Sequence, residues 1–250
     1  AGNIDTTIAT LDLDNTTSGN IDINETDALT INKIAQGGTG TVNVDAGGTI
    51  TVAASQSGVT ATSGSVELDA NGGASNVVVN DGVTTTGGAV NLLADDDVTF
   101  SADGDVASAN GIVTVTADIA GGNNGGVITM ANGALIDAGS GTIALTADGD
   151  ITLGGLITTN AGGTAVVVTS TSGGLVDGGA AHIDITANSG TVVIDAKTGV
   201  GHAGNIDTTI ATLDLDNTTS GNIDINETDA LTINKIAQGG TGTVNVDAGG

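Results

Sequence analysis

The sequence predicts an all-β fold, a parallel β-helix (β-solenoid), and three observations support this. The 48 residues Ala1–Gly48 return without a substitution as Ala203–Gly250, and self-similarity at a fixed period is the signature of a repeat architecture. Short segments alternate apolar and polar residues, which is the pattern of half-buried strands. Gly, Thr, Asn and Asp interrupt nearly every ten-residue window, so long helices are disfavoured.

The exact repetition defines the domain organisation. Residues 1–202 are expected to form one full long repeat of a continuous β-solenoid, and residues 203–250 the start of the next identical repeat, a copy of 1–48. No separate globular domain is expected. The chain is interpreted as a piece of a longer array.

A shorter rhythm runs inside the long period. The phrase Gly40–Ala46 is a candidate first strand, and Ile50–Val52 and Val59–Ala61 are candidate second and third strands before Gly64–Ala70 restarts the phrase. Three strands and three turns therefore make one coil of about 22 residues, with about nine coils in each repeat. Coils spaced by about 4.8 Å would make nine coils about 43 Å long, and the crossover rule favours right-handed winding.

The candidate first strands give a list of residues expected to stack in one column. In four coils the second strand starts eight residues after the first, so like strands are expected to lie on like strands. Val42, Val66 and Val90 should then lie one above another, and coils nine apart should superpose. The full set of expected positions is Ile4, Ile21, Val42, Val66, Val90, Val113, Ile143, Val166, Ile183 and Ile206.

One coil is unusually long. Between Val113 and Ile143 lies the glycine- and asparagine-rich segment Ala120–Gly126. We interpret it as a surface loop inserted into a single coil; two coils of 15 residues are the alternative.

Composition limits the core and the partners. There is no Trp, Tyr or Pro, so Val, Ile, Leu and Ala must fill a thin core, with Phe100 and Met130 in core positions of their strands. The 29 acidic residues face three lysines and no arginine, giving a net charge of −26. Such a surface is expected to bind no nucleic acid, which needs basic residues. No apolar run approaches the roughly 18 residues of a membrane helix, so no membrane insertion is expected.

A known family shares the strand phrase. The pattern Gly-x-Val/Ile-x-Val/Ile-x-Ala, followed by Ala147–Leu153 (ADGDITL), resembles filamentous-haemagglutinin-type tandem-repeat bacterial exoproteins and adhesins. The resemblance implies a right-handed β-helix, secretion across an outer membrane, and an extracellular or cell-surface role. No functional residue of the family carries over, since an Arg-Gly-Asp signal is impossible without arginine.

Acidic turns are the candidate metal sites. Carboxylates on a strand–turn frame could hold Ca²⁺; the alternatives are solvated Asx turns and weak, diffuse ion binding, with no cofactor required. The Gly-Gly-x-Gly-x-Asp array of calcium β-rolls is missing. The candidate ligands are Asp95, Asp96, Asp97, Asp103 and Asp105.

The remaining polar residues give weaker signals. His182 and His202 could stack on adjacent coils as a metal pair, but are more simply surface residues in turns. Lys33 is expected to pair with a carboxylate one coil away. Two carboxylates could also serve glycoside hydrolysis, but that needs a shaped pocket, usually with aromatic platforms that this composition lacks, so no enzyme is expected.

These observations favour a structural role. We expect a stiff acidic shaft or spacer in a giant extracellular bacterial surface fibre or adhesin. Its partners would be other copies of itself, end to end or side by side, and another cell surface. The alternative is a binding module whose repeats contact a host or partner cell or its glycans. Ice binding would need a regular Thr lattice, which the unequal coils do not provide.

Overall fold

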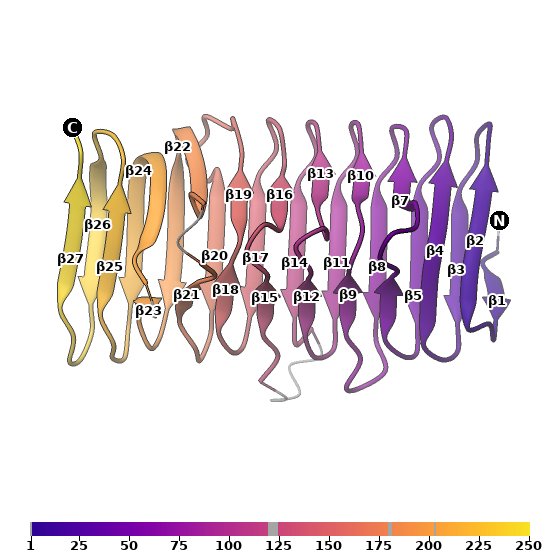
Figure 1. Cartoon of the computed structure of the whole chain (residues 1–250), viewed down its shortest axis with the longest axis horizontal. Coiled ribbons are helices and arrows are strands. Elements are labelled where there is room, and N and C mark those ends of the chain that lie inside the picture. The colour runs from indigo at the N-terminus through magenta and orange to yellow at the C-terminus, as the bar shows by residue number, and fades with distance from the viewer. Residues whose placement is uncertain (1, 120–124, 180–181, 203) are drawn as a thin grey trace.

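The computed structural model describes residues 2–119, 125–179, 182–202 and 204–250. These residues form 27 strands joined in one continuous sheet, and the described part of the chain contains no helix. The strands wind as a parallel β-solenoid of about 10 turns, with paired strands about 23 residues apart, and Figure 1 shows these turns side by side along the long axis. The predicted fold class is therefore confirmed. Among the described residues, none belongs to a helix that could cross a membrane.

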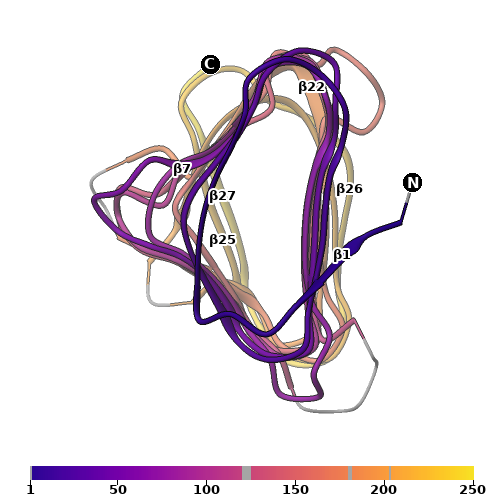
Figure 2. The same ribbon diagram turned by 90° about the vertical axis from the view of Figure 1, so that its right-hand side faces the viewer.

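A turn in the middle of the tube has one longer strand on one side and two short strands on the other. We call these the long-strand side and the short-strand side; viewed down the axis, they enclose a narrow tube (Figure 2). The long-strand side contains β1 (Ile4–Thr6), β3 (Ile21–Glu25), β5 (Val42–Ala46), β8 (Val66–Ala70), β11 (Val90–Ala94), β14 (Val113–Ala117), β17 (Ile143–Ala147), β20 (Val166–Ser170) and β26 (Thr232–Gln238).

The short-strand side carries two rows of strands. One row is β6 (Ile50–Val52), β9 (Val77–Val79), β12 (Val98–Phe100), β15 (Ile128–Met130), β18 (Ile151–Leu153), β21 (Leu175–Asp177) and β23 (Val200–His202). The other is β7 (Gly58–Ala61), β10 (Val83–Thr85), β13 (Val106–Ser108), β16 (Leu135–Asp137) and β19 (Gly155–Ile157). Near the ends lie β2 (Thr10–Asn15), β4 (Leu29–Gln36), β22 (Ile185–Ala196), β24 (Ile206–Asn217), β25 (Ile223–Glu227) and β27 (Val244–Ala248).

An aliphatic column runs up the inside of the long-strand side, and we call it the long-side column. It confirms that Val42, Val66 and Val90 lie one above another. Its members pair in register on adjacent parallel strands, and all except the last are buried. They are Ile21, Val42, Val66, Val90, Val113, Ile143, Val166, Val192, Leu213 and Ile233.

A second column, the short-side column, faces it across the core. It consists of Leu29, Ile50, Val77, Val98, Ile128, Ile151, Leu175, Val200, Ile223 and Val244. The four second strands predicted from the eight-residue offset begin at Leu29, Ile50, Val98 and Ile151, and all four lie in this column. Because each buried aliphatic side chain contacts its counterpart above and below, the two columns exclude water between Ile21 and Ile223.

Glycine is required where successive turns touch. Just before the long strand, a Cβ built on Gly64 would overlap the carbonyl oxygen of Gly40, and a Cβ on Gly40 would overlap that of Gly19. Any larger residue would push adjacent coils apart. The glycine that opens the strand phrase is therefore a packing requirement of the stack.

The long coil is a single coil. Val113 pairs directly with Ile143, so the alternative of two shorter coils is wrong. In the proposed inserted loop Ala120–Gly126, residues 120–124 lie outside the described residues. Phe100 and Met130 are both buried and pair in register on β12 and β15, as predicted for core residues.

Three of the expected column positions are wrong. Ile4 pairs with Ile23 and not with Ile21, so it lies outside the long-side column. Val166 pairs with Val192, and Val192 pairs with Leu213, so neither Ile183 nor Ile206 belongs to the long-side column. Ile183 lies in the turn before β22 and is 43% exposed. The reason is that apolar–polar alternation separates inside from outside but does not say on which side of the tube a strand lies.

The two identical segments lie on opposite sides of the tube. Ile21 pairs with Val42 in the long-side column, whereas their copies Ile223 and Val244 pair in the short-side column. Eight pairing steps lead from Ile21 to Leu213, and Ile223 follows half a turn later. The period thus holds about eight and a half turns, close to the predicted nine, but the expectation that coils nine apart superpose is wrong.

Candidate functional site

The predicted calcium ligands lie in two different turns. Asp95, Asp96 and Asp97 follow β11, whereas Asp103 and Asp105 follow β12, the next strand. Three of these five carboxylates accept hydrogen bonds from backbone amides of neighbouring coils. The pairs are Asp95 Oδ2 with Gly73 N at 2.7 Å, Asp97 Oδ1 with Val127 N at 2.9 Å, and Asp105 Oδ1 with Leu135 N at 2.9 Å.

These contacts give the turns a structural role. Within the described ranges, no group of three or more His, Asp or Glu side chains is arranged to hold a metal ion. Burial, together with the charges of Asp97 and Asp118, raises the pKa of Asp96. Asp103 is exposed. Calcium binding by this group therefore stays a prediction, and its diffuse form needs no shaped site.

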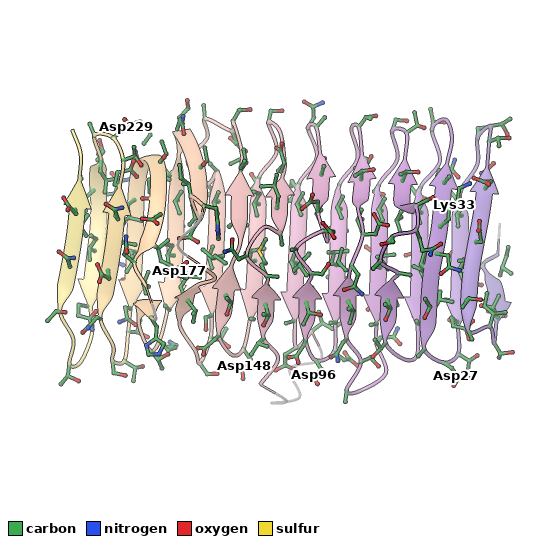
Figure 3. The ribbon with its side chains drawn as sticks, viewed as in Figure 1. Asp27, Lys33, Asp96, Asp148, Asp177 and Asp229 are labelled. Atoms are coloured by element: carbon green, nitrogen blue, oxygen red, sulfur yellow. The ribbon has the colours of Figure 1, made fainter. Side chains whose placement is uncertain are left out.

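Carboxylates elsewhere are held by amides of neighbouring coils. Asn43 Nδ2 donates to Asp22 Oδ1 at 3.3 Å, and Asn91 Nδ2 donates to a Glu67 oxygen at 3.0 Å. Figure 3 shows how densely such polar side chains cover the outside of the tube. We call these pairs the acid–amide ladder. Each of these hydrogen bonds offsets part of the repulsion between acidic side chains of adjacent coils.

Asp69 lacks this compensation at one of its carboxylate oxygens. Asp69 pairs in register with Asp45 on the strand below, and its Oδ1 atom is buried without a hydrogen-bond partner. Burial raises the pKa of Asp69 to about 6, and the charges of Asp45, Glu67 and Asp95 add to this effect. At neutral pH, Asp69 and the acidic side chains around it therefore repel one another.

The predicted lysine pair is confirmed. Lys33 Nζ lies 2.6 Å from an Asp14 carboxylate oxygen one coil away, and the copy Lys235 makes the same contact with Asp216. Both partners of the first pair are substantially exposed, so the contact contributes little to stability.

His182 is the polar residue whose surroundings were least expected. It lies in the turn leading to β22, as predicted, but its side chain is only 18% exposed. Its Nε2 atom lies 3.3 Å from Asp184 Oδ1, and its Nδ1 atom lies 3.1 Å from Asn132 Oδ1. His202 lies instead in β23, opposite Val176. The nitrogens of His182 therefore contact Asn132 and Asp184, and the alternative of a stacked histidine pair is wrong.

Asp184 is the more buried member of this pair, with a side chain that is 1% exposed. Burial raises its pKa to about 7; the backbone amide of Asp207 opposes this, and the charges of Asp177 and Asp207 add to it. A carboxyl group with a pKa near 7 changes its protonation state near neutral pH, where an ordinary aspartate stays ionised. This His182–Asp184 pair is the strongest candidate site for proton-dependent behaviour in the described chain.

Sequence reasoning could not find the pair. His182 and Asp184 are two residues apart in a turn, and Asn132 lies 50 residues earlier. Only the stacking register brings Asn132 under the imidazole. The buried carboxylate of Glu227 was missed for the same reason: it accepts hydrogen bonds from Thr208 Oγ1 at 2.8 Å and Ile210 N at 3.0 Å in the coil below.

A shallow hollow of about 520 Å³ lies along the short-strand side. It follows the ends of β7, β10 and β13 and is lined by the rows Thr60–Thr62, Thr84–Thr86 and Ala107–Ala109, with Asp137. The lining offers hydroxyl and methyl groups but a single charge. Such a surface can donate and accept hydrogen bonds without selecting one ligand.

The chain was compared with protein-family models, with curated proteins and with solved structures, and none of the three comparisons gives a match.

Proposed function

We propose that this chain is a shaft or spacer segment of an extracellular bacterial surface fibre, with no catalytic role. The observation that carries the proposal is the pair of unbroken aliphatic columns, from Ile21 to Ile233 and from Leu29 to Val244. A fold of this kind has one long dimension, and adding coils lengthens it without a new core design.

Stiffness follows from the direction of the bonds. The backbone hydrogen bonds between turns run along the axis, for example from Val42 N to Ser65 O and from Val66 N to Ala89 O, both 2.9 Å long. Bending the tube would stretch these hydrogen bonds on one side. It would also separate aliphatic side chains from their neighbours in the adjacent coils. The backbone and the core therefore resist bending together.

The charge supports a spacer. A net charge of −26 with only three basic residues makes identical tubes repel one another and keeps long polymers soluble. The resemblance of the phrase at Ala147–Leu153 to haemagglutinin-type exoproteins supports secretion and a place on the cell surface. The proposed partners are copies of the same repeat, and another cell surface reached by the end of the fibre.

A binding module is the second candidate, and the hydroxyl-lined hollow along β7, β10 and β13 favours it. In that case the repeats themselves, through rows such as Thr60–Thr62, would contact glycans or a partner cell.

Three measurements test the proposal. Antibodies against the chain should label intact cells, and negative-stain electron microscopy of cell-surface material should show uniform filaments that shorten when repeats are deleted. The purified chain should show no saturable binding to cells or to a glycan array. Labelling only after permeabilisation would contradict the extracellular role, and saturable binding by the purified chain would favour the binding module.

A further inference from the structure

The two identical segments make the same contacts within themselves. Asn43 Nδ2 donates to Asp22 Oδ1, and its copy Asn245 Nδ2 donates to Asp224 Oδ1 at 2.9 Å. The pairing of Ile21 with Val42 is likewise repeated. The segment is therefore the same small structure in both places, including its acid–amide ladder.

Their positions around the tube differ by half a turn. In the first copy β5 lies on the long-strand side, and β4 spans the short-strand side, where it pairs with both β6 and β7. In the second copy β26, the counterpart of β4, continues the long-side column. Figure 2 places β27, the counterpart of β5, on the side of β7 and opposite β26.

The labelled aspartates show the same relation. Asp27 and Asp229 are copies of each other, and Figure 3 places them at opposite edges of the tube.

The half-turn difference arises near the C-terminal end of the tube, where two short strands are replaced by one long strand. β22 is one strand of 12 residues that pairs with β19 through Ile185 and with β20 through Val192. β24 is also 12 residues long and pairs with both β25 and β26. Coils built from these strands have two sides of similar length, so a segment that fits one side also fits the other.

We infer that tandem copies of the 202-residue period build a fibre in which each copy is turned half a turn from the one before. Every interaction surface of the repeat then recurs alternately on the two opposite sides of the fibre, at an axial step of about 41 Å for eight and a half turns of about 4.8 Å. The acid–amide ladder is the surface displayed in this way.

The half turn can be measured in this chain, which has no native cysteine. Spin labels are attached to the double variant N43C/N245C and, separately, to N43C/T232C, and the distances are measured by pulsed electron paramagnetic resonance. Residue 232 adjoins Ile233 at the top of the long-side column, on the side of Asn43. N43C/V167C, in which both labels lie on the long-strand side five pairing steps apart, calibrates the rise per turn.

The expected result is a distance for N43C/N245C that exceeds that for N43C/T232C by roughly 10 Å. Both pairs are separated by similar axial distances, but only the first adds the thickness of the tube, about 10 Å between facing sheets, and two labels pointing in opposite directions. Equal distances, or a longer distance for N43C/T232C, would overturn the half turn. Circular dichroism of each labelled variant shows that the β structure is retained.

The extension to longer arrays rests on the proposed function and is tested separately. A chain of two complete periods, with N43C and N245C labelled by gold particles, should show the particles on alternate sides in electron micrographs. Particles on one side would overturn the extension even if the half turn holds in the shorter chain. Inert repeats found only inside cells would contradict the proposed function while leaving the half turn intact.

Discussion

Phe100 lies directly against Met130 in the adjacent coil, and both side chains are buried in the short-strand side of the core. They are the only aromatic residue and the only methionine of the chain. Their pairing places two large side chains of the core in neighbouring layers. The flexible thioether of Met130 can adapt its shape to the Phe100 ring, where a stiffer aliphatic side chain would leave a gap.

Replacing Phe100 by Ala should lower the free energy of unfolding by about 3–5 kcal/mol, because the cavity cannot collapse between fixed coils. The control is Ile112→Ala, at a side chain that is 51% exposed, for which a change of about 0.5 kcal/mol or less is expected. Guanidinium unfolding followed by circular dichroism measures both. Equal losses for the two variants would contradict a core packed in layers.

The glycine turn gives a second matched pair. Gly64→Ala should destabilise the chain by at least about 1 kcal/mol, since its Cβ would overlap the Gly40 carbonyl of the coil below. Gly87→Ala has open space around the new methyl group and no left-handed φ angle. It should be neutral or stabilising by about 0.4–1 kcal/mol through the unfolded state. Thermal melting distinguishes them; a harmless Gly64→Ala would mean that adjacent turns do not touch there.

The buried carboxyl group of Asp184 predicts a pH dependence of stability. Burial raises the pKa of Asp184 from 3.8 to about 7, so between these values the folded state keeps a proton that the unfolded state releases. The contribution of Asp184 to stability is therefore greatest below about pH 4 and falls as the pH rises to about 7. In Asp184→Asn this component disappears. Urea unfolding of both proteins from pH 4 to pH 7.5 measures it, and parallel curves would contradict the prediction.

Calcium should stabilise the tube by screening its acidic rows. We expect a higher melting temperature in millimolar calcium than in chelator, beyond the effect of sodium chloride at equal ionic strength. Diffuse binding predicts the same increase for the double variant Asp96→Asn/Asp103→Asn, whereas specific binding by the five candidate aspartates predicts a smaller one. Identical melting temperatures in calcium and chelator would exclude both forms of binding.

Much of the fold could be predicted because alternation records which side chains face inward. Val42, Val66 and Val90 share the phrase Gly-x-Val/Ile, and their stacking follows from it. The side of the tube could not be predicted, since Ile21 and Ile223 have the same neighbours in sequence and different ones in space. That difference depends on how many pairs of short strands are replaced by one long strand, such as β22, between the two copies.

The candidate site was harder to predict for a related reason. Asp95 and Asp97 were predicted to be calcium ligands because their neighbours in the sequence are acidic. Their carboxylates instead accept hydrogen bonds from Gly73 and Val127, residues of adjacent coils. In a stacked fold the partner of a side chain is set by register and lies some 20 to 30 residues away. Local spacing therefore identifies turn residues without identifying what they contact.

Another hydrogen bond between an amide and a carboxylate, from Asn71 to Asp45, makes the tube sensitive to chemical ageing. Asn71 donates to Asp45 at 2.6 Å and is followed by Gly72, whose small size leaves the Asn side chain open to attack by the next backbone nitrogen. Asparagine is among the thermolabile residues, and its deamidation here would set two carboxylates against each other beside the strained Asp69. Old material would then carry more negative charge and fewer hydrogen bonds between coils than new material. Ageing would therefore begin at the polar contacts on the outside of the tube and not in its aliphatic core.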